Sequence, residues 1–184
     1  RPRDWSSDVC SSDLRPAPLG AEMVFYRRRL PHWQPEGKSL FVTWRLHGSL
    51  PKPVAAVRNA HPGSQDSLRA DDLLADEEFL TKDRQLDEAR TGPLWLCNPL
   101  VADMVVDALR FSERELKLYA LSAFVIMPNH MHVLWKPEYA VEVITRRLKG
   151  YTSLQANRIL GRVGQRFWQA ESFDHWIRTD GEFD

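Results

Sequence analysis

Residues 116–135 constrain the fold more than any other segment, because they form two apolar stretches separated by a very short break. Residues 116–126 alternate in polarity and then become wholly apolar, as a central strand does. Met127-Pro128-Asn129 interrupts this run, and residues 130–135 resume an extended pattern. Strands joined so tightly pair antiparallel. The chain is therefore expected to contain an antiparallel sheet built around this hairpin.

Three further segments complete the expected domain. Residues 39–47 are rich in aromatic and β-branched side chains and end at a Gly-Ser-Leu-Pro turn, which predicts a strand. Residues 98–115 and 140–160 carry apolar side chains at helical spacing, and Pro99 suits a first helical turn. The order strand, helix, two strands, helix predicts an α+β fold: a ferredoxin-like antiparallel sheet with helices on one face.

Composition limits the class of protein. The chain has 184 residues, enough for one domain, and 43% of them are hydrophobic. Its 25 basic and 25 acidic residues exclude a uniformly basic nucleic-acid coat but permit a local basic face. Two cysteines cannot form a disulfide framework, and Cys97 is expected to be buried. No run reaches the roughly 18 apolar residues of a membrane helix, so we expect a cytoplasmic protein without a membrane partner.

The two ends of the chain differ from the rest. Residues 4–14 back-translate to a widely used sequencing-adapter oligonucleotide, so we interpret residues 1–14 as an adapter artefact or a disordered tail and assign them no role. The expected domain spans residues 23–184. Residues 178–184 end within a helix-like start, and we expect further C-terminal sequence.

An acidic segment separates the first strand from the first helix. Residues 51–66 are rich in Pro and Gly and are expected to form a loop. Residues 66–90 contain nine acidic and four basic residues, with leucines and a phenylalanine near helical spacing. They predict a helical, acidic-faced insertion, which we expect to lie away from any nucleic acid.

His130-Met131-His132 is the sharpest candidate for chemistry. On a strand, residues two apart point to the same face, so both imidazoles project together while Met131 points into the core. Two nitrogen donors on a rigid element suit a divalent cation, although such a site needs further ligands. The alternative is a pair of solvent-facing strand histidines without a ligand.

The order of motifs resembles the HUH single-tyrosine transposases, and in particular the REP-associated tyrosine transposases, or transposase IS200-like proteins. The hairpin with its His-Met-His strand and the basic helix after it carry the resemblance. Separate landmarks in the same order extend it over roughly residues 25–184: Tyr26-Arg27-Arg28-Arg29-Leu30-Pro31-His32-Trp33, Phe41-Val42-Thr43-Trp44-Arg45-Leu46, Leu148-Lys149-Gly150-Tyr151-Thr152, Ala156-Asn157-Arg158, Phe167-Trp168-Gln169, Phe173-Asp174 and Ile177-Arg178.

The resemblance implies an HUH endonuclease-like domain that cleaves and rejoins hairpin-bearing single-stranded DNA. His130 and His132 would bind Mg²⁺ or Mn²⁺, and a tyrosine would attack the phosphate to leave a 5′-phosphotyrosine. It also implies a homodimer. In the family the tyrosine lies in a helix beyond the landmarks, with an amide side chain four residues later. We expect this catalytic helix to lie beyond Asp184, with Tyr151 as the weaker candidate nucleophile.

Local basic density marks the expected DNA surface. Residues 136–178 hold eight basic and four acidic residues, and a second basic block lies near the start of the domain. The tryptophans are expected either to stack on unpaired bases or to pack in the core. The candidate DNA-binding residues are Arg27, Arg28, Arg29, Arg45, Arg146, Arg147, Lys149, Arg158, Trp168, Gln169 and Arg178.

Two alternatives remain open at the level of sequence. A DNA-binding module could keep the scaffold without catalysis, because the chain carries no tyrosine at the family position. A metal-dependent hydrolase could instead use the histidine pair to activate water. Whether the chain is an enzyme therefore stays undecided from sequence.

Overall fold

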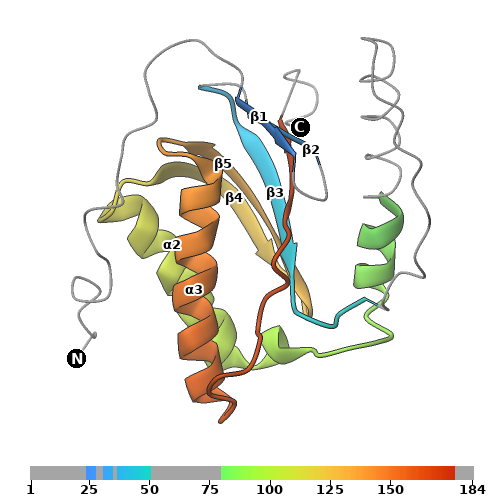
Figure 1. Cartoon of the computed structure of the whole chain (residues 1–184). Coiled ribbons are helices and arrows are strands. Elements are labelled where there is room, and N and C mark those ends of the chain that lie inside the picture. The colour runs from blue at the N-terminus through green and yellow to red at the C-terminus, as the bar shows by residue number, and fades with distance from the viewer. Residues whose placement is uncertain (1–23, 28–30, 35–36, 51–79, 177–184) are drawn as a thin grey trace.

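The computed structural model describes residues 24–27, 31–34, 37–50 and 80–176 (Figure 1). The strands are β1 (Val24–Arg27), β2 (Pro31–Gln34), β3 (Leu40–Arg45), β4 (Tyr119–Ile126), β5 (His130–Pro137) and β6 (Phe173–Trp176). The helices are α2 (Pro99–Arg114), α3 (Val141–Ile159), the short 3₁₀ helix η2 (Trp95–Cys97) and a helical segment over 80–87.

The main sheet has four antiparallel strands in the order β4-β5-β3-β6, and β1 pairs with β2 in a separate two-stranded sheet. The predicted hairpin is confirmed: Ile126 of β4 lies opposite Met131 of β5, and the Met127 amide donates to the His130 carbonyl at 2.9 Å. In the β3–β5 register, Thr43 lies opposite His132 and Arg45 lies opposite His130. Strands β1, β2 and β6 were not anticipated from sequence.

Helices α2 and α3 lie together on one face of this sheet, which confirms the predicted α+β architecture (Figure 1). The Asn98 side chain caps α2 by accepting from the Leu100 amide at 3.0 Å, and Pro99 occupies the first turn. The core between helices and sheet contains Val42, Trp44, Met131, Val133, Trp135, Val105, Leu109, Ile144 and Leu148. This packing fixes the inward face of β5.

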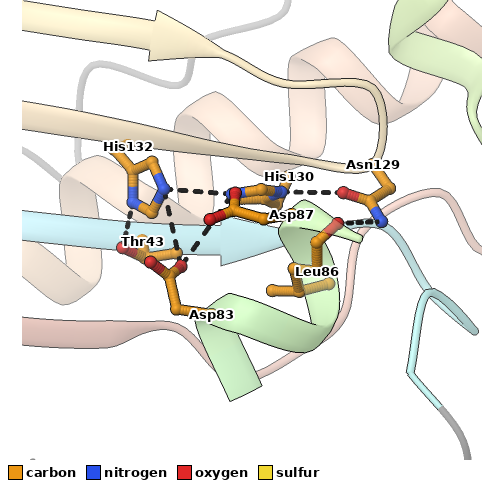
Figure 2. A network of polar contacts seen from close by, with 7 residues as sticks. All are labelled: Thr43, Asp83, Leu86, Asp87, Asn129, His130 and His132. Carbon is orange, nitrogen blue, oxygen red and sulfur yellow. Dashed lines mark hydrogen bonds and ion pairs between the residues drawn. The ribbon is translucent and has the colours of Figure 1, made fainter. Parts of the chain in front are cut away.

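The alternation along β5 fixes the outward face as well. Met131 and Val133 are buried in the core, so His130 and His132 project from the opposite face. The helical segment 80–87 lies on that opposite face, in front of the two imidazoles (Figure 2). The sheet therefore carries two helices on one side and this acidic segment on the other.

The connection after this helical segment passes very close to the backbone of the turn that follows β3. Gly92 has φ of 83°, and a Cβ at that position would meet the Gly48 carbonyl oxygen at 2.3 Å. Only glycine fits such an approach without moving the turn that follows β3. This contact keeps the chain after the helical segment against the end of β3, the strand that carries Thr43.

Other expectations have mixed outcomes. The acidic segment is helical over 80–87, whereas residues 66–79, the expected loop at 51–66 and residues 1–23 lie outside the described residues. Cys97 is exposed, so its expected burial was wrong: η2 turns that side chain to solvent while Leu96 is buried. None of the described helices is long and apolar enough to cross a membrane.

Candidate metal centre

Two imidazoles face one another at the end of the hairpin. The Nε2 atoms of His130 and His132 are 3.0 Å apart, and the two rings are nearly perpendicular. The His130 side chain is fully buried and that of His132 is 13% exposed. The solvent-facing alternative for these histidines is therefore wrong, because the segment 80–87 covers them.

Asn129 orients the first ring. Its Nδ2 donates to the Leu86 carbonyl at 3.0 Å, so its Oδ1 must be the atom that lies 2.7 Å from His130 Nδ1. An amide oxygen can only accept, and Nδ1 therefore carries the hydrogen. The neutral His130 ring consequently has a bare Nε2, which is the form that binds a metal.

Thr43 and Phe41 of β3 orient the second ring. The Thr43 hydroxyl lies 2.7 Å from His132 Nδ1, and the Phe41 ring stacks on the imidazole with centroids 5.2 Å apart. Thr43 is buried, so its rotamer is held by packing. Both imidazoles thus have one nitrogen occupied by a partner and the other directed at the common site (Figure 2).

The segment 80–87 contributes two carboxylates. Asp83 Oδ1 lies 3.5 Å from His132 Nε2 and 3.9 Å from His130 Nε2, and Asp87 Oδ1 lies 3.7 Å from His130 Nε2. Residues four apart share one face of a helix, so both carboxylates point the same way. Asp83 Oδ1 is buried without a hydrogen-bond partner.

Burial controls the charge states of these groups. Burial and, to a smaller degree, the neighbouring His132 lower the pKa of His130, and with Asp87 opposing them the value falls to about 4. Burial also lowers the pKa of His132, against the opposing effect of the two carboxylates. The pKa of Asp83 is raised, mainly by burial. Both imidazoles are therefore neutral near pH 7.

These residues fit a divalent cation. Two nitrogens about 2.1 Å from one ion and at right angles to each other are about 3.0 Å apart, which is the separation found here. A buried carboxylate oxygen without a hydrogen bond is costly unless a cation or proton satisfies it. Asp83, His130 and His132 together form the one His/Asp group of this kind among the described residues.

Asp83 was missed from sequence. The sequence predicts that the acidic segment is helical, but it also predicts that this segment lies away from any nucleic acid. The i, i+4 spacing of Asp83 and Asp87 was a usable signal, because it places two carboxylates on one helix face. Nothing in the sequence indicated that this face meets the imidazoles.

The predicted DNA-binding residues occupy different places. Arg45 lies on the imidazole face, with its Nη1 donating to the Ser49 hydroxyl at 3.2 Å, and burial lowers its pKa. Lys149 Nζ donates to the carbonyls of Gln169, Ala170 and Glu171 at 3.1 to 3.3 Å. Trp168 is buried and donates to the Thr152 hydroxyl, as expected of a core tryptophan.

Three of the remaining arginines and Tyr151 lie on α3, away from the imidazoles. Arg146 and Arg158 are exposed on α3, which lies on the other face of the sheet, and Arg147 is half-buried there. Tyr151, also on α3, packs against the core. Arg27 lies in β1, but its side chain and the residues Arg28, Arg29 and Arg178 lie outside the described part of the chain.

Comparison with known proteins gives a match among solved structures. No family model matches the chain, and no curated protein matches it. Among solved structures, the chain matches a REP-associated tyrosine transposase bound to a REP hairpin, with 20% sequence identity and a TM-score of 0.40. The match covers 88% of this chain and 66% of that one, so this chain spans just under two thirds of its length. This protein thus has a structural match to a REP-associated tyrosine transposase.

Proposed function

We propose that this protein is a metal-dependent, HUH-type DNA transposase domain that binds single-stranded DNA beside a hairpin. The observation that carries the proposal is the pair of Nε2 atoms 3.0 Å apart, facing a buried Asp83 oxygen that has no hydrogen bond. This arrangement is suited to hold one divalent cation, Mg²⁺ or Mn²⁺. The ordered motifs of the sequence supply the DNA part of the proposal.

Each residue has a distinct role in this proposal. His130, His132 and Asp83 would hold the cation, which supplies positive charge against the charge that develops on the nonbridging phosphate oxygens. Asn129 and Thr43 keep the two rings in the ligand orientation. Arg45 lies opposite His130 on the same face, where its guanidinium suits a neighbouring DNA phosphate.

The proposed strand transfer needs a hydroxyl nucleophile. The tyrosine hydroxyl loses its proton to solvent as its oxygen attacks phosphorus and forms a bond to the 5′-phosphate; the bond to the 3′ oxygen breaks, and this oxygen takes a proton from solvent and leaves as a 3′ hydroxyl. The intermediate conserves the bond for rejoining. Tyr119, Tyr139 and Tyr151 lie in or against the core, so these three are poorly placed to act as the nucleophile.

DNA binding gives the first test. A fluorescein-labelled hairpin oligonucleotide with single-stranded flanks is titrated with protein, with and without Mn²⁺, and fluorescence anisotropy is followed. We expect Mn²⁺ to tighten binding at least about tenfold, or about 1.4 kcal/mol. His132→Ala should lose this effect, whereas His47→Ala should keep it, because His47 lies near Gln169 rather than at the site. Equal affinity with and without Mn²⁺ in the wild type would contradict the proposal.

A non-catalytic DNA-binding module is the second candidate, favoured by the core location of Tyr119, Tyr139 and Tyr151. Denaturing gels of the same mixture distinguish the candidates. A covalent protein–DNA adduct identifies the transposase, and metal-dependent binding without cleavage identifies the module. A hydrolase would instead release a free 5′-phosphate without any adduct. Tyr151→Phe should leave adduct formation unchanged.

A further inference from the structure

The face of the segment 80–87 carries one more carboxylate than the three-residue group needs. Asp87 lies one helical turn after Asp83, and its Oδ1 is 3.7 Å from His130 Nε2. The corresponding distance from Asp83 to His132 is 3.5 Å. Asp83 thus lies within 4 Å of both imidazoles and Asp87 within 4 Å of His130, from the same side of the sheet (Figure 2).

We propose that Asp87 is a fourth cation ligand, so that the site is a two-histidine, two-carboxylate centre for a first-row transition ion such as Mn²⁺ or Zn²⁺. The inference rests on the metal-binding part of the proposed function alone. It does not depend on the nature of the substrate.

Charge supports a fourth ligand. Asp83 and Asp87 lie one helical turn apart, each has an oxygen within 4 Å of an imidazole Nε2, and two like charges at this spacing on a helix repel each other. A divalent cation between them removes this repulsion, and its two positive charges equal the two negative charges of the carboxylates. The four donors thus form a neutral centre when a cation is bound.

Burial distinguishes the two carboxylates. The Asp83 side chain is 24% exposed, whereas that of Asp87 is 54% exposed. Asp83 is therefore the fixed ligand, and Asp87 lies at the solvent side of the centre. Residue 87 also ends the helical segment, and Ala89 follows with φ of 47°. From this position Asp87 would bind the ion at the solvent side of the centre.

The donor set determines the class of ion. Mg²⁺ and Ca²⁺ are bound mainly by oxygen, whereas imidazole nitrogen favours later first-row ions. Two nitrogens among four donors therefore favour Mn²⁺ and Zn²⁺ over Mg²⁺. The order of affinities for such a site is Zn²⁺ above Mn²⁺.

Mn²⁺ binding, measured by electron paramagnetic resonance of the free ion, tests the inference without any DNA. We expect Asp87→Asn to weaken Mn²⁺ binding by about tenfold or more, in the range that metal-site substitutions commonly produce. Glu88→Gln is the matched control, because this neighbouring carboxylate pairs with Arg90 at 3.4 Å. It should leave Mn²⁺ affinity unchanged.

The outcomes separate this inference from the proposed function. Unchanged Mn²⁺ affinity in Asp87→Asn, with binding in the wild type, would overturn the fourth ligand only. Loss of affinity in Glu88→Gln as large as in Asp87→Asn would also overturn it, because the effect would then be one of general charge. Absence of Mn²⁺ binding to the wild type would overturn both proposals. A tenfold excess of Mg²⁺ that displaces Mn²⁺ would overturn the assigned class of ion.

Discussion

The side-chain amide of Asn129 joins the ring of His130 to the carbonyl of Leu86. It therefore links the hairpin that carries the imidazoles to the segment that carries the carboxylates. Asn129 is fully buried, and its own carbonyl also accepts from the Leu46 amide at 2.8 Å. One residue thus holds three elements of the site in place.

Asn129→Ala should lower both metal affinity and stability. The variant lacks the amide oxygen that accepts from His130 Nδ1, so the imidazole ring is no longer held in one orientation. We expect this loss to reduce Mn²⁺ affinity by about 10- to 100-fold. Loss of the buried hydrogen bonds should cost about 1–3 kcal/mol in the free energy of unfolding. Asn98→Ala is the control: it removes the cap of α2, costs about 1 kcal/mol and leaves Mn²⁺ affinity intact. Equal Mn²⁺ affinity in the two variants would refute the role of Asn129.

Thr43 tests the orientation of the second ring. Thr43→Val keeps the shape of the side chain but removes the oxygen 2.7 Å from His132 Nδ1, so Mn²⁺ affinity should fall by about tenfold or more. Thr43→Ser keeps the hydroxyl and should restore most of the affinity. Isothermal titration with Mn²⁺ measures both. A serine variant as weak as the valine variant would mean that packing, and not the hydroxyl, matters here.

Lys149 and Arg146 should respond differently to substitution. Lys149→Met removes an ammonium that donates to three backbone carbonyls, so we expect a loss of about 1–3 kcal/mol in unfolding free energy.

Arg146 is exposed on α3, and Arg146→Ala should leave stability unchanged. If Arg146 contacts a DNA phosphate, the slope of log affinity against log salt should fall by about one unit. An unchanged slope would remove Arg146 from the DNA surface.

The buried hydroxyl of Tyr119 should make the stability of the fold depend on pH in the alkaline range. Its hydroxyl donates to the Leu109 carbonyl at 2.8 Å, and burial raises its pKa above the usual value of a phenol. Above about pH 10 the unfolded chain loses this proton while the folded protein keeps it, so stability falls as pH rises. Tyr119→Phe should flatten this fall, as measured by urea unfolding between pH 9 and 11. A wild-type curve as flat as that of the variant would contradict the assignment.

Cation binding should stabilise the folded protein. At a Mn²⁺ concentration of 100 times Kd, the free energy of unfolding should rise by about 2.7 kcal/mol, and a chelator should reverse the gain. His132→Ala should show no gain, because it removes one of the ligands, whereas His47→Ala should respond like the wild type. Thermal unfolding with and without Mn²⁺ measures this. A gain in Tm that survives in His132→Ala would place the cation elsewhere.

Local pattern determined what could be predicted from sequence. The β4–β5 hairpin and the common face of His130 and His132 follow from alternation within one short segment, and both were confirmed. Helices α2 and α3 were likewise predicted, because their apolar residues recur at helical spacing. These features need no knowledge of distant parts of the chain.

Features that depend on distant contacts were missed. Strand β6 is short, and its pairing with β3 joins residues far apart in sequence, such as Val42 and Asp174. The position of Asp83 depends on the Gly92 approach to the turn after β3 and on the link from Asn129 to Leu86. Sequence periodicity describes a helix face but not the surface that this face meets.

The most direct test is a crystal structure of the protein soaked in Mn²⁺, with anomalous diffraction recorded to locate the ion. We predict one strong peak about 2.0–2.3 Å from the Nε2 atoms of His130 and His132 and from Asp83 Oδ1. No peak between these atoms, or a strong peak elsewhere with this position empty, would contradict the metal centre on which the account depends.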